Sequence, residues 1–268
     1  VTQKNGLRFS AKKAYLQPIR SRSNLRVITT AHVTKLIFAD PDAQDKCIIG
    51  VQFKSGHNVR QIRTHKSIIL SAGAFQSPQI LELSGIGRAE HLRDLGIRVM
   101  TDLQGVGENL TDHYISRLSW RLNKDISINK TAHGIRLLQE IIRFGLTRRG
   151  SLSLPAGILA GFVRSREGLV GPDIQYHIAN ASFANPAKRV FDKFPGMTFG
   201  PCQLRPESRG TVHIKSADPF AAPAIQPNYL ATSEDERVHV AGMRIAREIM
   251  QSEIMVPFVD HEMKPGKE

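Results

Sequence analysis

The sequence predicts a mixed α/β fold made of two parts. In the first part, short strand-like runs precede a buried strand that leads through a small-residue turn into a helix. In the second part, strand-like runs separated by Pro and Gly accompany two amphipathic helices. With 268 residues, 41% hydrophobic and 23% charged, the chain has enough material for one large domain or two smaller ones.

Four short runs near the N-terminus are expected to form a β-meander. They are rich in β-branched residues and are broken at Thr30, at Pro41 and at Ser55-Gly56. The expected strands are 25–29, 33–38, 48–54 and 59–65.

A strand is expected next, within the segment KSIILSAGAFQSPQILELSGIG at 66–87. Residues 67–71 form a nearly continuous apolar run, which is typical of a strand buried on both faces of a parallel sheet. The small residues 72–74 then allow a tight turn, and glycine permits a positive φ or a close backbone approach.

A capped helix should follow this turn. Ser77 is expected to be the N-cap, Pro78 the first helical residue, 79–83 the apolar stripe, and Gly85 the end. The free N–H groups at such a helix start suit a phosphate or an electron-rich ring edge. A plain strand-to-helix connection without a ligand explains the same spacing equally well.

A short helix at 91–95, ended by Gly96, leads to the loop GVGENLTDH at 105–113, and a domain boundary is expected near His113. Beyond it, the apolar spacing of 131–146 predicts a one-sided helix. Residues 174–178, 198–199 and 211–215 are strand candidates of a second sheet. Ser233 and Glu236 form a capping box for a last helix, which should bury Val238, Ala241, Ile245 and Ile249.

The net charge of +13 is concentrated near the N-terminus, because residues 1–66 hold 13 Lys and Arg but only three acids. The basic residues are scattered through strand-like runs, and no nucleic-acid motif accompanies them. A solvated face is therefore favoured, nucleic-acid binding is not expected, and weak adhesion to an anionic membrane surface is the next alternative.

Cysteine usage indicates neither a disulfide framework nor a metal site. Cys47 and Cys202 lie far apart, with no CxxC and no histidine at ligand spacing, so both are expected to be small buried hydrophobes in a reducing compartment. No apolar run has the length of a membrane helix, and the start VTQKNGLRFS is not a signal peptide. We expect a cytoplasmic protein or one at the inner face of the cytoplasmic membrane. The initial Val fits a piece of a longer protein.

Several segments resemble the glucose-methanol-choline (GMC) oxidoreductases. SAGAFQSPQILELSGIG is similar to the family's second signature, and GVGENLTDH is similar to the loop that follows it. The block 204–230, LRPESRGTVHIKSADPFAAPAIQPNYL, and residues 5–33 resemble further parts of the family, and the resemblance is weakest over 114–170. GPDIQYH at 171–177 and SADPFAAPAI point to the choline-dehydrogenase-like bacterial branch.

This resemblance implies an α/β, or mixed α+β, fold with FAD as cofactor. Residues 1–113 would be part of an FAD-binding Rossmann-like domain with the β-meander as an insertion. Residues 114–268 would be a substrate domain built on an antiparallel sheet with helices, with a truncated C-terminal-type segment from about 204. The chain would be an internal fragment lacking both ends.

The implied activity is oxidation of a primary alcohol, choline-like or other, on CH–OH donors. Such a reaction needs a base and a cofactor that accepts hydride. No GxGxxG turn precedes Asn5, and the family's histidine base would lie C-terminal to Glu268, so no catalytic residue is expected here and the fragment alone should be inactive. The electron acceptor could be a membrane quinone. The alternatives are an oxidase that uses oxygen and a noncatalytic basic binding module.

The resemblance also implies five cofactor contacts. It places the main chain of Val33 against adenine, Ala72 and Gly73 at the turn approaching the dinucleotide, and Asn109 and Asp112 near the flavin. The adjacent Asp112 and His113 could form a base with its orienting carboxylate, but a structural role at the domain junction is favoured.

Trp120 is the obvious aromatic candidate for a choline cage, and a role as a hydrophobic anchor is favoured over it.

Overall fold

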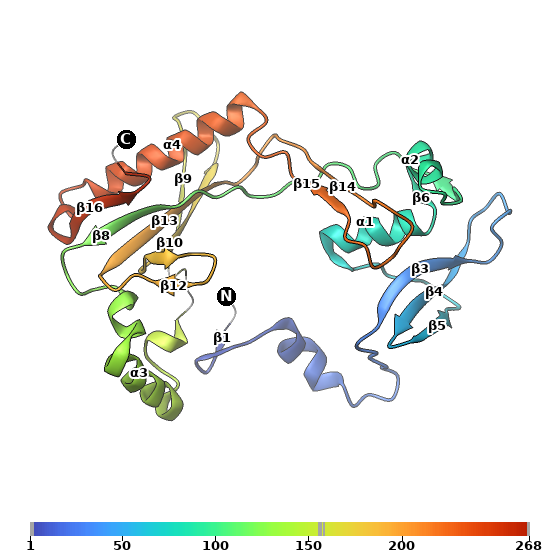
Figure 1. The fold of residues 1–268 in the computed structure, drawn as a ribbon, viewed down its shortest axis with the longest axis horizontal. Coiled ribbons are helices and arrows are strands. Elements are labelled where there is room, and N and C mark those ends of the chain that lie inside the picture. The colour runs from blue at the N-terminus through green and yellow to red at the C-terminus, as the bar shows by residue number, and fades with distance from the viewer. Residues whose placement is uncertain (1–2, 155–156, 158, 267–268) are drawn as a thin grey trace. The chain divides into compact units, whose positions relative to one another are not determined.

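The structure is a computed structural model that describes residues 3–154, 157 and 159–266. The chain forms two compact units, each assembled from separated stretches of sequence. One, called here the sheet unit, consists of Val1–Leu25, His113–Glu207 and Thr232–Glu268. The other, the meander unit, consists of Arg26–Asp112 and Ser208–Ala231. Figure 1 shows the elements of both units along the chain.

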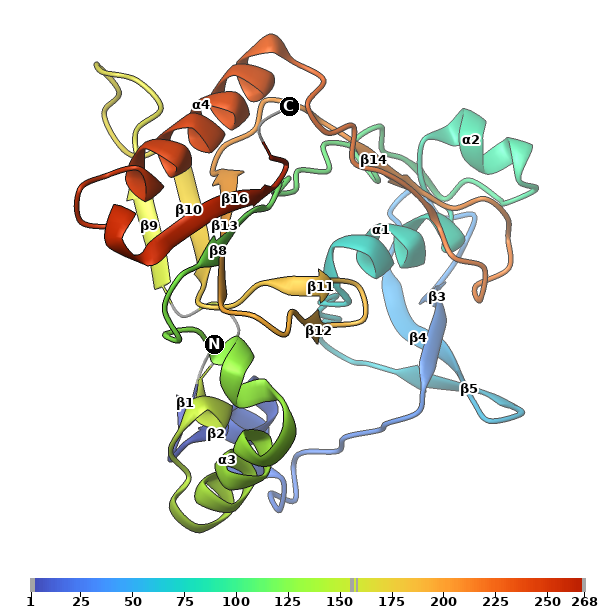
Figure 2. The ribbon, with the colours of Figure 1, turned by 60° about the vertical axis from the view of Figure 1, so that its left-hand side comes forward.

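The sheet unit is built on five antiparallel strands in the order β16-β8-β13-β10-β9. Helix α4 lies along one face of this sheet (Figures 1 and 2). The elements are β8 (Leu118–Leu122), β9 (Leu159–Val163), β10 (Ile174–Ala179), β13 (Gly196–Gln203), β16 (Val259–Lys264) and α4 (Ser233–Met250). The runs expected at 174–178 and 198–199 are therefore strands, while β8, β9 and β16 were not predicted.

The core of this unit lies between the sheet and α4. Leu118, Trp120 and Tyr176 on the strands pack with Val238 and Met250 on the helix. The Tyr176 hydroxyl donates a hydrogen bond of 2.6 Å to the carbonyl oxygen of Gly242 on α4. Burial of the ring raises the pKa of this hydroxyl, so it stays a donor.

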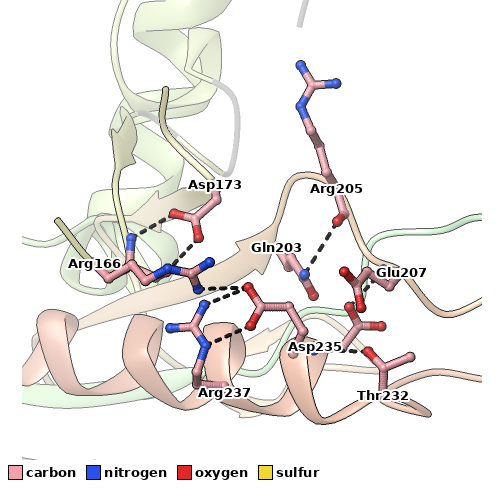
Figure 3. A network of polar contacts seen from close by, with 10 residues as sticks. Arg166, Asp173, Gln203, Arg205, Glu207, Thr232, Asp235 and Arg237 are labelled. Atoms are coloured by element: carbon pink, nitrogen blue, oxygen red, sulfur yellow. Dashed lines mark hydrogen bonds and ion pairs between the residues drawn. The ribbon is translucent and has the colours of Figure 1, made fainter. Parts of the chain in front are cut away.

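Helix α4 begins one residue earlier than the capping box predicts. Thr232 is the N-cap, and its hydroxyl accepts a hydrogen bond from the N–H of Asp235 at 3.2 Å. The buried Asp235 carboxylate in turn accepts from the N–H of Glu207 at 2.8 Å, as Figure 3 shows. Glu234 receives hydrogen bonds from Arg166 and Arg237, so the start of α4 is tied to the β9–β10 connection.

Helix α3 (Gly134–Thr147) confirms the helix expected at 131–146. Its apolar stripe of Ile135, Leu138, Ile142 and Leu146 is exposed in the structure. The remaining elements of the sheet unit are short: β1 (Gln3–Lys4), β2 (Leu7–Arg8), β11 (Phe183–Asn185), β12 (Val190–Phe191), a π-helix at Lys12–Leu16, and 3-10 helices at Gln17–Ile19, Ile128–Ala132, Ser151–Ser153 and Val256–Phe258.

The meander unit contains three of the four strands expected near the N-terminus. They are β3 (His32–Phe38), β4 (Ile48–Ser55) and β5 (Asn58–Arg63), which pair antiparallel in this order. Leu36 on β3 packs with Ile80 and Ile86 in the second hydrophobic core. The prediction of a strand at 25–29 is wrong, because these residues join the two units without pairing to a strand.

The segment 66–87 departs from expectation at two places. Residues 67–71 are not a strand, because a strand needs a hydrogen-bonded neighbour and these residues pair with none in the described chain. Helix α1 (Gly73–Leu83) begins directly after them, so Ala72 rather than Ser77 is the N-cap and Pro78 lies inside the helix. Gly85, with φ of +83°, follows the helix end as expected.

The other elements of the meander unit are α2 (Ala89–Asp94), β6 (Ile86–Gly87), β7 (Thr101–Asp102), β14 (Thr211–His213) and β15 (Ala224–Gln226). Helix α2 confirms the short helix before Gly96. The strand expected at 211–215 forms, but it pairs with β15 in this unit and not with the five-stranded sheet. Among the described residues, no helix is long and apolar enough to cross a membrane.

Candidate functional site

A cavity of about 550 Å³ lies in the meander unit, between helix α1 and the loop 105–111. Both walls come from the two segments that the sequence singled out. The lining residues are Ala74, Ser77, Pro78, Leu81, Gly105, Val106, Gly107, Glu108, Asn109, Leu110, Thr111 and Val212.

The start of α1 forms one end of this wall. Gly73 has φ of +94°, and an added Cβ there would meet no atom within 4 Å, so the backbone is open to an approaching group. The Ser77 hydroxyl accepts a hydrogen bond of 3.1 Å from the N–H of Ala72. The amide groups and the dipole of this helix start favour an electron-rich ligand atom.

The loop 105–111 forms the other wall and is held by β14. The main chains of Leu110 and Gly210 exchange two hydrogen bonds, of 2.9 and 2.8 Å. Gly107 has φ of +81°, and a Cβ there would lie 2.5 Å from the carbonyl oxygen of Val212. Only glycine fits this approach. Asn109 also has a positive φ, +60°, which asparagine tolerates better than most residues.

Asp112 and His113 follow the loop and have separate partners. The Tyr229 hydroxyl donates a hydrogen bond to the Asp112 carboxylate, and this bond is the main reason why the pKa of Tyr229 is raised. His113 Nε2 lies 3.1 Å from the carbonyl oxygen of Leu204. Both contacts fit the structural role that the sequence favours for these residues.

The five expected cofactor residues take different places relative to the cavity. Asn109 lines it, Ala72 and Gly73 lie at the start of the helix that lines it, and Asp112 directly follows the lining residue Thr111. Val33 is on β3, paired with Phe53 of β4, and its side chain packs against the second hydrophobic core.

Sequence reasoning missed the polar residues of the cavity wall. Ser77 was interpreted only as a helix cap, and Glu108 and Thr111 were not singled out. Glu108 and Thr111 both belong to the loop sequence GVGENLTDH, which the sequence analysis did single out as a segment. It also missed a cluster formed by Glu82, His91 and His213, whose members are far apart in sequence.

The helix start with its open backbone position and the glycine-bearing loop together form a site suited to an electron-rich ligand, such as the phosphates of a dinucleotide. Two family models, both described as GMC oxidoreductase, match the chain, one over residues 1–115 and the other over residues 206–268. The chain belongs to the GMC oxidoreductase family, whose cofactor is FAD.

Curated relatives match along almost the whole chain. An uncharacterized GMC-type oxidoreductase from Mycobacterium bovis is 38% identical over 94% of this chain and 46% of its own length. An alcohol dehydrogenase [acceptor] from Pseudomonas putida is 35% identical over 99% of this chain and 48% of its own. An oxygen-dependent choline dehydrogenase from Staphylococcus epidermidis is 36% identical over 98% and 45%. The chain thus spans about half the length of the curated relatives it matches.

Solved structures share the fold at lower identity. Pyridoxine 4-oxidase from Mesorbium loti, at 22% identity, has a TM-score of 0.80 over 99% of this chain and 47% of its own. A formate oxidase variant from Aspergillus oryzae, at 23% identity, has a TM-score of 0.81 over 93% of this chain and 48% of its own. The mixed α/β architecture is therefore that of GMC oxidoreductase structures over about half their length.

Proposed function

We propose that this chain is part of an FAD-dependent oxidoreductase that oxidises a primary alcohol, choline-like or other. The similarity to alcohol and choline dehydrogenases over nearly the whole chain is the observation that carries this proposal. The same proposal assigns residues 1–113 to an FAD-binding, partial Rossmann-like domain and 114–268 to a substrate domain.

The cavity wall fits part of a bulky dinucleotide. The open position beside Gly73 and the open position at Gly105, where an added Cβ would also meet nothing within 4 Å, leave room for a ligand at both walls. Ala72 and Gly73 would face the dinucleotide at the helix start, Asn109 and Asp112 would hold the flavin side, and the main chain of Val33 would lie near adenine. When bound, FAD accepts the hydride that alcohol oxidation releases.

This chain's own residues would bind and orient the cofactor but would not remove the substrate proton. Asp112 accepts a hydrogen bond from Tyr229, and His113 lies beside the carbonyl oxygen of Leu204. We propose, from the family resemblance, that the proton-abstracting histidine lies C-terminal to Glu268 in the full-length protein and that the isolated fragment is inactive.

We do not propose that Trp120 selects the substrate. Its indole is 3% exposed and meets Phe199 edge to face, with ring centroids 5.6 Å apart, so it is a core anchor and cannot cage an ammonium group. The proposed substrate class is a small primary alcohol in general.

The electron acceptor separates two forms of the enzyme. A dehydrogenase would pass electrons to a quinone, and the basic N-terminal region could hold it weakly at the inner face of the cytoplasmic membrane. An oxidase would reduce oxygen to peroxide, and the oxygen-dependent relatives favour testing this form.

Expression of the full-length protein tests the proposal. We expect bound-flavin absorbance and alcohol-dependent reduction of an artificial dye, with a panel of primary alcohols including choline. Peroxide formation in air would identify an oxidase. A protein without flavin that is retained on nucleic acid or anionic vesicles in a salt-sensitive way would instead be a basic binding module, and the proposal would be wrong.

A further inference from the structure

Three side chains from three separate elements of the meander unit converge on one point. Glu82 lies on α1, His91 on α2 and His213 on β14, and one ligand atom from each lies within 4.8 Å of the other two. The Glu82 side chain is fully buried and that of His213 is 13% exposed. The cluster is thus sheltered from bulk solvent, unlike most surface groups of charged residues.

The hydrogen bonds of this cluster leave a place for a cation. His213 Nδ1 lies 2.7 Å from Glu82 Oε1, and His213 Nε2 lies 3.0 Å from Glu108 Oε1. A neutral imidazole has one N–H, so it can donate to only one of two carboxylates. A metal ion bound at Nδ1 would place positive charge beside the buried Glu82, while Nε2–H donates to Glu108.

We propose that Glu82, His91 and His213 bind a divalent transition-metal ion of the Zn²⁺ type, with Glu108 as the partner that orients His213. Two imidazoles and one carboxylate are a ligand set that Zn²⁺ uses in proteins, and a water molecule would complete the tetrahedron. The ion would balance the charge of both carboxylates.

The outer hydrogen bonds are already arranged for this role. If His213 Nε2–H donates to Glu108, its Nδ1 is left deprotonated and faces Glu82, which is how a carboxylate commonly orients a metal-bound histidine. Glu82 uses Oε2 to accept the N–H of Ile214 at 2.8 Å, which leaves Oε1 for the ion. His91 Nε2 lies 3.1 Å from the carbonyl oxygen of Ile214, so its ring is also held.

The distances are compatible with small side-chain adjustments. Ligand atoms on one tetrahedral Zn²⁺ lie about 3.3 Å apart, so atoms within 4.8 Å of one another must move by roughly 1 Å to bind. Two glycines leave space for the cluster. A Cβ at Gly87 would lie 3.2 Å from Glu82 Cγ, and a Cβ at Gly107 would lie 2.6 Å from His213 Nδ1. The bound ion would tie α1, α2 and β14 together and, through Glu108, would hold the loop 105–111.

Zinc titration of the full-length flavoprotein tests the site. The protein is treated with EDTA, dialysed into metal-free buffer and titrated with Zn²⁺ by calorimetry, and Co²⁺ is added separately to record its visible absorption. We compare wild type with His91→Gln, His213→Gln and the control His57→Gln, which changes an exposed histidine of the same unit.

We expect wild type and His57→Gln to bind a Zn²⁺ ion with the same affinity. His91→Gln and His213→Gln should bind it at least about tenfold more weakly, and Glu108→Gln about 10–100-fold more weakly. Tetrahedral Co²⁺ absorption should appear only where binding is retained. His91→Gln changes one side-chain hydrogen bond and one ring contact, with His213, so it keeps the test valid if His213→Gln fails to fold. Equal Zn²⁺ uptake by wild type and His91→Gln would overturn the proposal. Flavin absorbance of each sample shows separately whether the proposed function holds.

Discussion

Glu82 accepts a hydrogen bond of 2.8 Å from the main-chain N–H of Ile214, a residue 132 positions later in the chain. The bond joins helix α1 to the segment after β14. It is one of the contacts that hold Ser208–Ala231 in the meander unit. A fully buried carboxylate at this junction makes the unit sensitive to a single substitution.

The first prediction concerns this carboxylate. Glu82→Leu should lower the free energy of unfolding of the full-length protein by about 3–5 kcal/mol, because it leaves the buried N–H of Ile214 without its acceptor and removes the buried partner of His213. Urea denaturation measures the change. Glu90→Leu, on the exposed face of α2, should cost less than about 1 kcal/mol, and an equal loss in both variants would contradict the role of Glu82.

The second prediction compares two glycines of the same loop. Gly107→Ala should destabilise the protein by about 1–3 kcal/mol, since its φ is positive and the new Cβ would overlap the carbonyl oxygen of Val212. Gly105→Ala meets no protein atom within 4 Å and should be nearly neutral in the cofactor-free protein. Thermal unfolding of both apoproteins checks the difference, and similar melting temperatures would refute it.

The third prediction distinguishes the observed helix cap from the expected one. Thr232→Ala should cost about 1 kcal/mol because it removes the hydroxyl that accepts the N–H of Asp235. Ser233→Ala, at the position that the capping box predicts, should change stability by a few tenths of a kcal/mol. Denaturation curves of the two variants decide between the positions.

The fourth prediction is a pH dependence of stability from His239. Burial lowers the pKa of this imidazole below its ordinary value of 6.5, so the unfolded chain binds a proton at a higher pH than the folded chain does. This contribution to stability is present above pH 6.5 and declines as the pH falls towards the lowered folded-state pKa. In His239→Gln, the decline of stability with falling pH should be flatter than in wild type. In His65→Gln, which changes an exposed histidine, the decline should be the same as in wild type.

The fifth prediction concerns the proposed flavin side of the cavity. Tyr229→Phe removes the hydrogen bond to Asp112 and should weaken FAD binding by about 1 kcal/mol, or roughly fivefold in Kd. Titration of the apoprotein with FAD, followed by fluorescence, measures the change. Tyr15→Phe, whose ring is 77% exposed, serves as the control, and equal affinities would remove Asp112 from the proposed contacts.

Local signals predicted the elements whose stabilising contacts are close in sequence. Strands β3, β4 and β5 form a meander with neighbouring partners, and α2 ends at a glycine in the expected way. The stripe of α3 was evident from its spacing, although the structure leaves that stripe exposed. The cavity loop was recognised from its own motif.

Elements that depend on distant contacts could not be predicted in the same way. Residues 67–71 have the composition of a buried strand, but composition does not supply a neighbouring strand. Strand β16 pairs with β8 across more than a hundred residues, so neither carried a local signal. The convergence of Glu82, His91 and His213 depends on three elements meeting, and their sequence spacing resembles no ligand motif.

The buried indole of Trp120 makes the chain suitable for fluorescence spectroscopy. It is the one tryptophan among these 268 residues, and it sits against Phe199 in the core of the sheet unit. Its emission should be blue-shifted while that core is intact and should shift to the red when water enters. The meander unit contains no tryptophan, so within this stretch of chain tryptophan fluorescence reports the unfolding of the sheet unit and does not report that of the meander unit.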